Sequence, residues 1–265
     1  MIPTGDYADD LSLALRIADQ VDALTMRNCD PAHLTVELKP DDTPVTAVDR
    51  AAEQLIRELL ARERPSDSVL GEEYGSSGDA ARRWILDPID GTKNFIRGVP
   101  VWATLISLFD GDTPAVGVVS APALGRRWFA AAGAGAWEGH DASAARRLSV
   151  SKVTTLSEAS VSYSSLTGWE EANRLDALLD LSRRVWRTRA YGDFWSYMLV
   201  AEGVVDIAAE PELEVYDMAA LVPIVLEAGG SFTSLDGVTG PFGGNAAATN
   251  GLLHEAALAA LAPRT

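Results

Sequence analysis

The stretch WILDPIDGTKNF places two aspartates, Asp87 and Asp90, three residues apart. Two carboxylates this close repel each other, which raises the pKa of one of them unless a cation lies between them. The apolar Trp-Ile-Leu run is typical of the end of a buried strand, and the proline after Asp87 favours extended geometry there. Gly91 and Thr92 indicate a turn followed by a helix start, because glycine tolerates unusual φ and a threonine oxygen can cap a helix. The segment therefore predicts that Asp87 ends a strand and that two carboxylates lie beside a helix N-terminus.

Further acids stand at the ends of other expected elements. Glu72 and Glu73 follow an apolar strand in VLGEEYG, Asp49 lies near a helix start in TAVDRAAEQ, and Asp217 opens a helix in VYDMAALVPIVLEAGG. Mg²⁺ prefers oxygen ligands and keeps several waters, so carboxylates from several segments are the expected protein contribution to a magnesium site. Three scattered histidines and no CxxC or HExxH pattern make zinc a poor fit.

Each of these acids also has a purely structural interpretation. Asp217 could cap its own helix, and Thr46 with Asp49 fits a capping box. Glu73 is expected to face solvent, and Glu72 alone would be unremarkable in sequence. Asp87 and Asp90 are harder to explain structurally, because the Asp-Pro-Ile-Asp-Gly-Thr segment leaves both carboxylates little freedom.

Charge and composition narrow the classes of function. The 265 residues include 22 basic and 38 acidic ones, a net charge of −16. The negative electrostatic field of such a chain repels nucleic acid and anionic membranes. It would also repel a phosphorylated metabolite unless bound divalent cations made the local potential at the site positive. A lone Cys29 fits a reducing compartment, and the apolar stretches are too short to span a bilayer. We expect a cytoplasmic protein that binds neither nucleic acid nor membranes.

The hydrophobic pattern predicts two parts with a boundary near residue 150. Residues 1–150 are expected to form an α+β domain with two opening helices, a mobile proline-rich loop at 37–46 and a largely antiparallel sheet from 69 to 150. The sheet's predicted strands include RRLSVS, and Gly133-Ala134-Gly135 is expected to be a turn. Residues 151–265 alternate strands with helices, expected at 169–184, 194–203 and 217–228, which favours an α/β domain contributing Asp217 and substrate contacts.

The three motifs GEEYG, WILDPIDGTKNF and VYDMAALVPIVLEAGG resemble, in this order, those of the inositol monophosphatase family of Mg²⁺-dependent, lithium-sensitive phosphatases. The resemblance spans residues 39–230. It implies an α/β fold layered as an αβαβα five-layer sandwich, often in a homodimer. It also implies two or three Mg²⁺ ions per subunit, held by Glu72, Asp87, the carbonyl of Ile89, Asp90 and Asp217, with Asp49 near the third ion. Tyr216 stands where the family usually has tryptophan.

The resemblance also assigns roles in phosphate ester hydrolysis. Two Mg²⁺ ions roughly 3.5–4 Å apart can activate a water, hold the phosphoryl oxygens and neutralise the leaving alkoxide. Thr92, with Glu72 or Asp49, would orient or deprotonate that water. The backbone N–H groups of Gly91 and Thr92 would bind the phosphate at a helix start, and Lys39 would close over the site.

The segment RAYGDFWSY and a downstream acid bear on the substrate. In inositol-preferring members a small neutral segment occupies the position of Gly192 and Asp193, and a glutamate corresponds to Glu210. A pocket with Asp193 and Glu210 favours a cationic amine over a neutral polyol. RAYGDF together with KNFIRGVPVWA resembles the histidinol-phosphate phosphatases of the family, and Tyr191 would line the same pocket.

The sequence thus predicts a Mg²⁺-dependent phosphomonoesterase that hydrolyses L-histidinol phosphate. The alternatives are an inositol 1-phosphate or sugar-phosphate phosphatase and, in a different class, a metal-binding regulatory protein without turnover. Asp193 could instead be the N-cap of the following helix. The aromatic side chains of Trp102, Tyr191 and Trp195 could pack on an imidazole, or they could belong to the core.

Overall fold

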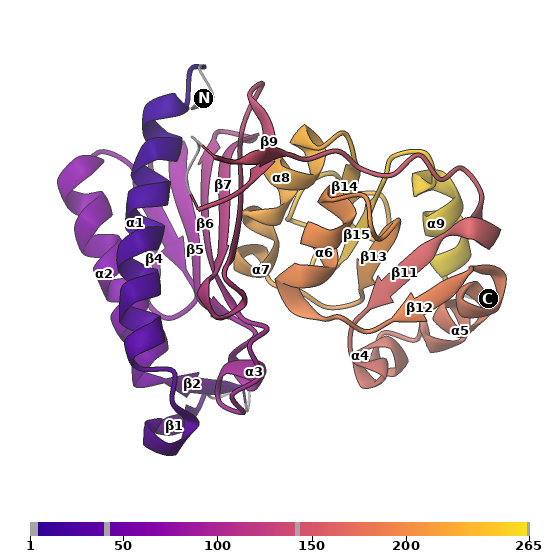
Figure 1. Cartoon of the computed structure of the whole chain (residues 1–265), viewed down its shortest axis with the longest axis horizontal. Helices are drawn as coiled ribbons and strands as arrows, with labels where there is room; N and C mark the ends of the chain where they lie inside the picture. The colour runs from indigo at the N-terminus through magenta and orange to yellow at the C-terminus, as the bar shows by residue number, and fades with distance from the viewer. Residues whose placement is uncertain (1–4, 40–42, 141–143, 264–265) are drawn as a thin grey trace.

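The computed structural model describes residues 5–39, 43–140 and 144–263, and their elements stack in the order αβαβα (Figure 1). Two helices cover one face of a large sheet, three helices lie between this sheet and a smaller one, and three more cover the outer face of the smaller sheet. The predicted layered α/β sandwich is confirmed.

The large sheet has eight strands among the described residues. In spatial order they are β10 (Arg146–Arg147), β9 (Gly135–Glu138), β8 (Arg126–Ala131), β7 (Thr113–Ala121), β6 (Ala103–Asp110), β5 (Arg82–Asp90), β3 (Ser68–Gly71) and β4 (Gly75–Ser77). All neighbouring pairs are antiparallel except β3 and β5, which are parallel. The expectation of a largely antiparallel sheet is therefore correct. The turn predicted at residues 133–135 covers residues 132–134 and joins β8 to β9, with Gly135 already the first residue of β9.

The outer helices α1 (Ala8–Arg27) and α2 (Ala47–Glu63) pack on the large sheet, α1 against β6 and β7 and α2 against β5. The start of α2 is fixed by a capping box. The side chain of Thr46 accepts from the N–H of Asp49, and Asp49 Oδ2 accepts from the N–H of Thr46 at 2.9 Å. The structural interpretation of this pair is thus correct, and it places Asp49 at the buried end of the helix.

The middle layer consists of α6 (Asp193–Ala201), α7 (Val215–Ala219) and α8 (Leu221–Glu227). The largest buried apolar cluster joins this layer to both sheets, with Trp128 from β8, Ala208 from β13 (Ile207–Glu210) and Met198 from α6. Because one core extends across the boundary near residue 150, the division into two domains stays a prediction.

The small sheet is mixed. Its order among the described residues is β12 (Arg187–Arg189), β11 (Ser160–Tyr163), β13, β15 (Ala246–Thr249) and β14 (Ser231–Thr233). β11 runs parallel to both neighbours, and the other pairs are antiparallel. Its outer face is covered by α4 (Leu166–Glu171), α5 (Leu175–Arg184) and α9 (His254–Leu261) (Figure 1).

Several predicted elements differ from the observed ones. The helix predicted at 169–184 is two helices, α4 and α5, because Asn173 between them adopts a left-handed φ of 55°. The helix predicted at 217–228 begins two residues earlier, after Glu214, and is divided at Ala220 into α7 and α8. The strand predicted at RRLSVS is reduced to the two residues of β10.

The proline-rich segment at 37–46 contains more regular structure than expected. β1 (Val36–Leu38) and β2 (Pro44–Thr46) pair as an antiparallel hairpin. Residues 40–42 lie outside the described part of the chain, so the prediction of a mobile loop is untested there. Short 3₁₀ helices occur at Pro31–His33, Pro122–Leu124 and Leu156–Glu158.

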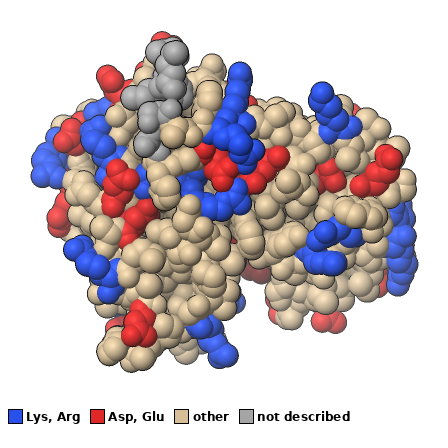
Figure 2. Space-filling view, viewed as in Figure 1, with Lys and Arg blue, Asp and Glu red and all other residues tan. Residues whose placement is uncertain are grey.

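The described surface carries both signs of charge. Figure 2 shows blue and red side chains dispersed over one face, and a notch between the part that carries the large sheet and the part that carries the small one. Within the described residues, none of the helices combines the length and apolar character needed to cross a membrane.

Candidate active site

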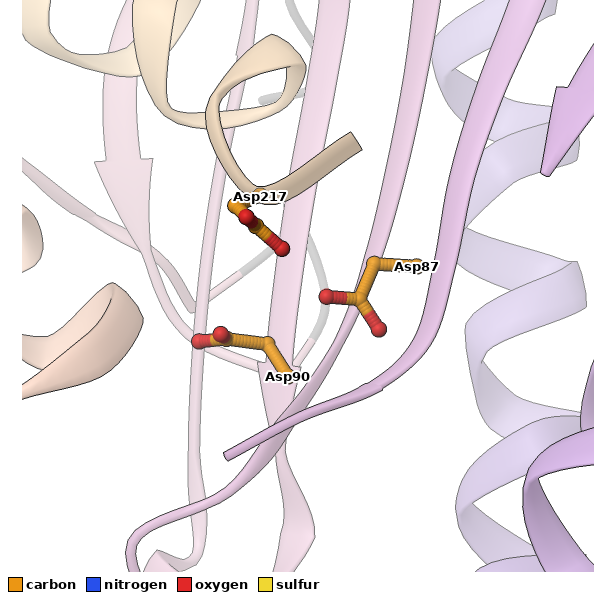
Figure 3. Close-up of side chains that lie close together, drawn as sticks. All are labelled: Asp87, Asp90 and Asp217. Carbon is orange, nitrogen blue, oxygen red and sulfur yellow. The ribbon is translucent and has the colours of Figure 1, made fainter. Parts of the chain in front are cut away.

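Three aspartates from two elements meet at one place. Asp87 and Asp90 lie at the end of β5, and Asp217 comes from α7. Each offers a carboxylate oxygen that lies within 4.8 Å of those of the other two. Figure 3 shows the three carboxylates facing a common space. The structure therefore brings together acids separated by 127 positions in the chain, counted from Asp90 to Asp217.

The geometry of β5 explains how two of these acids reach the same space. The prediction that the strand ends at Asp87 is wrong, because the strand continues to Asp90. Its pairing with β6 is irregular between these two residues. Asp87 Oδ1 accepts from the N–H of Ile89 at 3.0 Å, and the carbonyl of Pro88 accepts from Thr104 Oγ1 at 2.9 Å. The local bend is thus held from both sides, and both carboxylates emerge on one side of the sheet.

Burial and like charges raise the pKa values of all three aspartates. Burial raises the pKa of Asp87 well above its usual range, and the charges of Glu72, Asp90 and Asp217 raise it further. Burial and the charge of Asp193 do the same for Asp90. The pKa of Asp217 rises to about 7, mainly through burial and partly offset by a hydrogen bond from the N–H of Glu214. Such a set of oxygen donors fits a hard divalent cation, which would stabilise the ionised forms.

Glu72 and Glu73 lie in the turn between β3 and β4. Lys39 Nζ contacts Glu72 Oε1 at 2.7 Å and Glu73 Oε1 at 2.6 Å. Burial alone would lower the pKa of Lys39, but its hydrogen bonds to the two glutamates outweigh burial and raise it. The expectation that Glu73 faces solvent is wrong, since only 4% of its side chain is exposed. Lys39 thus reaches the acidic end of the site from the β1–β2 hairpin.

Thr92 and Asp49 lie on a second side of the aspartates. Thr92 Oγ1 donates to the carbonyl of Ile89 at 3.0 Å and lies 3.4 Å from Asp49 Oδ1. Burial raises the pKa of Asp49, and hydrogen bonds from Thr46 oppose this shift. Gly91, with φ of 83°, precedes the short helix α3 (Thr92–Phe95). Its conformation and a Cβ position 2.9 Å from the carbonyl of Val101 explain the need for glycine.

Asp193 and Glu210 approach Asp90 from the middle layer and the small sheet. The N–H of Phe194 donates to Asp90 Oδ2 at 2.7 Å, which ties the start of α6 to the aspartates. Burial raises the pKa of Asp193 to about 6, and the charge of Lys93 opposes the shift. Burial and the charge of Asp193 raise the pKa of Glu210 to about 8. Asp193 is not the N-cap of α6, because Gly192 occupies that position and Asp193 is the first helical residue, with φ of 49°.

The aromatic candidates separate into two groups. Trp102 is buried against Phe95, with ring centroids 4.9 Å apart, so its core interpretation is correct. Tyr191 is half-buried; it packs on Trp195 with centroids 5.6 Å apart, and its hydroxyl accepts from Arg187 at 2.9 Å. Its role as a substrate residue stays a prediction, as does that of Gly192.

Two residues at the site were not anticipated from sequence. Asn94 Nδ2 donates to Asp193 Oδ2 at 2.9 Å and to the carbonyl of Val101 at 2.9 Å. Tyr197 is buried beside Glu210, and burial together with the charge of Glu210 raises the pKa of its hydroxyl. The hydroxyls of Tyr197 and Ser164 hydrogen-bond to Glu210 and oppose the rise of its pKa.

Comparison with known sequences gives a consistent result. The model of the inositol monophosphatase family matches residues 6–264. The chain is 61% identical over 263 residues to a histidinol-phosphatase of Streptomyces coelicolor, covering 98% of this chain and 99% of that protein. It is 58% identical over 254 residues to a histidinol-phosphatase of Mycobacterium tuberculosis, covering 96% of this chain and 98% of that protein.

Solved structures with the same arrangement include an inositol monophosphatase of Zymomonas mobilis. It superposes with a TM-score of 0.85 at 33% identity, covering 97% of this chain and 99% of that one. The IMPase of Thermotoga maritima gives a TM-score of 0.85 at 29% identity, with 96% of each chain covered.

Proposed function

The chain belongs to the inositol monophosphatase family, and we propose that it hydrolyses L-histidinol phosphate to L-histidinol and phosphate with the help of Mg²⁺. It is a phosphoric monoester hydrolase, in keeping with the histidinol-phosphatases to which it is 58–61% identical along nearly the whole chain. The family is metal-dependent, and the buried acidic cluster fits such ions.

The proposed ligands of Mg²⁺ are Glu72, Asp87, the Ile89 carbonyl, Asp90 and Asp217. Their support is the set of oxygen donors from three segments, together with the burial and the like charges that raise the pKa values of the aspartates. Bound Mg²⁺ would lower the pKa of a water, orient the phosphoryl group and neutralise the leaving oxygen.

The proposed catalytic residues beside these ligands are Thr92, Asp49 and Glu72. The Thr92 hydroxyl donates to the Ile89 carbonyl, which leaves its lone pairs free to accept a hydrogen bond from the attacking water and so to orient that water. Asp49 lies 3.4 Å from that hydroxyl, and burial raises its pKa, which makes its carboxylate a stronger base. Glu72, whose charge also raises the pKa of Asp49, can share this role.

The phosphate group would be held by the backbone N–H groups of Gly91 and Thr92 and by Lys39. The first two lie at the start of α3, where backbone donors point outward. Lys39 is the cation that lies against Glu72 and Glu73. In an acidic chain this ammonium would help a phosphate ester to approach.

The observation that carries the choice of substrate is the pair of carboxylates formed by the half-buried Asp193 and the buried Glu210. Glu210 is 6% exposed, and hydrogen bonds from the neutral hydroxyls of Tyr197 and Ser164 oppose the rise of its pKa without cancelling it. Neutral donors leave the charge of a buried carboxylate uncompensated, so its ionised form is unfavourable until a cation arrives. The ammonium group of histidinol phosphate supplies such a partner, whereas inositol 1-phosphate offers only hydroxyls.

The test is phosphate release with Mg²⁺ from histidinol phosphate and from inositol 1-phosphate. We expect kcat/KM to be at least about 100-fold higher for histidinol phosphate, which corresponds to about 2.7 kcal/mol of transition-state binding. The reverse preference would assign the chain to inositol or sugar phosphates. Metal binding without release of phosphate from either ester would instead indicate a regulatory protein.

We also propose that the enzyme acts in the cytoplasm as a homodimer. The lone Cys29 is consistent with a reducing compartment, and the family resemblance supports a dimer. Sedimentation equilibrium would test the second point, and a monomer at micromolar concentration would contradict it.

A further inference from the structure

Glu53 is an acid that lies entirely inside the protein. It stands in the middle of α2, one turn after Asp49, and has no exposed surface. A carboxylate removed from water this completely is tolerated only where donors surround it. The identity of those donors therefore indicates what the residue does.

The donors are the backbone of the turn that follows Glu72. Glu53 Oε2 accepts from the N–H of Glu73 at 2.7 Å, and Oε1 accepts from the N–H of Tyr74 at 3.2 Å. Arg57 Nε donates to Oε1 at 2.7 Å and supplies the compensating charge. Both carboxylate oxygens of Glu53 are thus engaged with a single turn.

Gly71, the residue before the turn, leaves room for this carboxylate because it has no side chain. A Cβ atom at Gly71 would lie 2.0 Å from Glu53 Oε1, so the acid fills the space that a side chain would need. On the other side, the N–H of Glu72 donates to the carbonyl of Leu86 in β5 at 3.2 Å. The turn is therefore held between α2, which carries Asp49, and β5, which carries Asp87.

We propose that Glu53 is a positioning residue that fixes the Glu72–Tyr74 turn and so sets the direction of the Glu72 side chain toward the metal site. The proposal rests on Glu72 being a metal ligand, as in the proposed function. Glu53 contacts neither metal nor substrate. It acts through two backbone N–H groups, in the manner of residues that orient metal ligands from outside the coordination shell.

The test compares Glu53→Gln with Asp67→Asn. The substituted glutamine would retain the volume but only one acceptor, so at least one N–H of the turn loses its partner. Asp67 is a matched control: its side chain is 4% exposed and accepts from Trp84 Nε1 and Arg82, and it lies at the opposite end of β3 from the turn. Calorimetric titration with Mn²⁺ alone, well below the unfolding temperature, gives the metal affinity, and thermal unfolding gives the stability.

We expect Glu53→Gln to weaken Mn²⁺ binding about 10- to 100-fold, the range found for residues that orient ligands, while Asp67→Asn lowers stability and leaves Mn²⁺ affinity within about twofold. Loss of stability with unchanged affinity in Glu53→Gln would overturn the proposal. If Glu53→Gln does not fold, Glu53→Asp, whose shorter side chain still faces Arg57, is measured against the same expectation.

Glu72→Gln, titrated in parallel, separates this inference from the proposed function. If Glu72→Gln binds Mn²⁺ as the unaltered protein does, the ligand assignment itself is wrong. If Glu72→Gln weakens binding and Glu53→Gln does not, the ligand assignment stands and the positioning role of Glu53 is wrong.

Discussion

The side-chain amide of Asn94, on the short helix α3, donates a hydrogen bond to Asp193 Oδ2 on α6 at 2.9 Å. This contact joins the segment that carries the proposed phosphate site to the one that carries the proposed ammonium site. The same amide donates to the carbonyl of Val101, so its orientation is fixed. The Asn94 amide and the hydrogen bond from the N–H of Phe194 to Asp90 together hold the start of α6 against the segment that follows β5.

We expect Asn94→Leu, which keeps a similar volume but removes the amide, to lower kcat/KM for histidinol phosphate about 10-fold more than for inositol 1-phosphate. A tenfold change corresponds to about 1.4 kcal/mol, near the value of a hydrogen bond to a charged group. The ratio of the two kcat/KM values is the readout, because general destabilisation would lower both alike.

Asn245→Leu provides the control for this prediction. Asn245 is also half-buried and accepts from the N–H of Leu235, but it lies in a loop of the C-terminal part. Its replacement is expected to lower stability and leave the substrate ratio unchanged. An unchanged ratio in Asn94→Leu as well would show that Asn94 only stabilises the fold.

The raised pKa values of Asp193, about 6, and Glu210, about 8, predict a pH-dependent substrate preference. Both groups are neutral when protonated and attract an ammonium only when ionised. The ratio of kcat/KM for histidinol phosphate to that for inositol 1-phosphate should therefore rise with pH between about 6 and 8. The Asp193→Asn/Glu210→Gln double variant separates this effect from titration of the substrate's imidazole, and an equal rise in that variant would refute the assignment.

Lys39 is predicted to act on the phosphate end of every substrate. Lys39→Met should raise KM about 5- to 10-fold for histidinol phosphate and inositol 1-phosphate alike, about 1 kcal/mol of binding that does not depend on the leaving group. Arg50→Met is the control, because Arg50 pairs with Glu37 on the same hairpin and its removal changes the net charge equally. Equal effects of the two variants on KM would mean that Lys39 attracts the phosphate only through its long-range positive charge and does not contact it.

The parts of the site that sequence predicted are those encoded locally. Asp87 and Asp90 could be placed because a strand end, a proline and a glycine turn occur within a few residues, and each restricts its neighbours directly. The placement of Glu73 failed for the opposite reason. Its burial depends on Lys39, which comes from a hairpin 34 positions earlier and leaves no mark on the VLGEEYG pattern itself.

Glu53 and the end of the small sheet show two further limits. Glu53 follows Asp49 by four positions and lies next to the apolar stripe of α2, so an acid on a buried helix face was the signal that could have identified it. The strand β15, Ala246–Thr249, was not anticipated because alanine is depleted in strands, and only pairing with β13 and β14 makes this segment extended.

Without metal, the aspartate cluster should destabilise the protein at neutral pH. The folded-state pKa of Asp217, about 7, lies above its unfolded value, so the folded state binds more protons between about pH 4 and 7 and stability falls as pH rises through that window. Asp217→Asn, which keeps an acceptor for the N–H of Glu214, should raise the unfolding free energy of the metal-free protein at pH 7.5 by roughly 1–3 kcal/mol and its Tm by roughly 2–4 °C per kcal/mol.

In saturating Mg²⁺, Asp217→Asn should lower the unfolding free energy instead of raising it. The reason is that bound metal stabilises the unaltered protein much more than it stabilises the variant. Asp206→Asn is the contrasting control. Asp206 is buried and accepts from Ser151 and from the N–H of Ser160, so its replacement should destabilise the protein with and without Mg²⁺. Thermal unfolding of the three proteins in EDTA and in Mg²⁺ measures all of these values. If the metal-free Asp217→Asn protein is less stable than the unaltered one, the charge of Asp217 does not destabilise the metal-free fold. Asp217 would then serve chiefly as part of the helix cap.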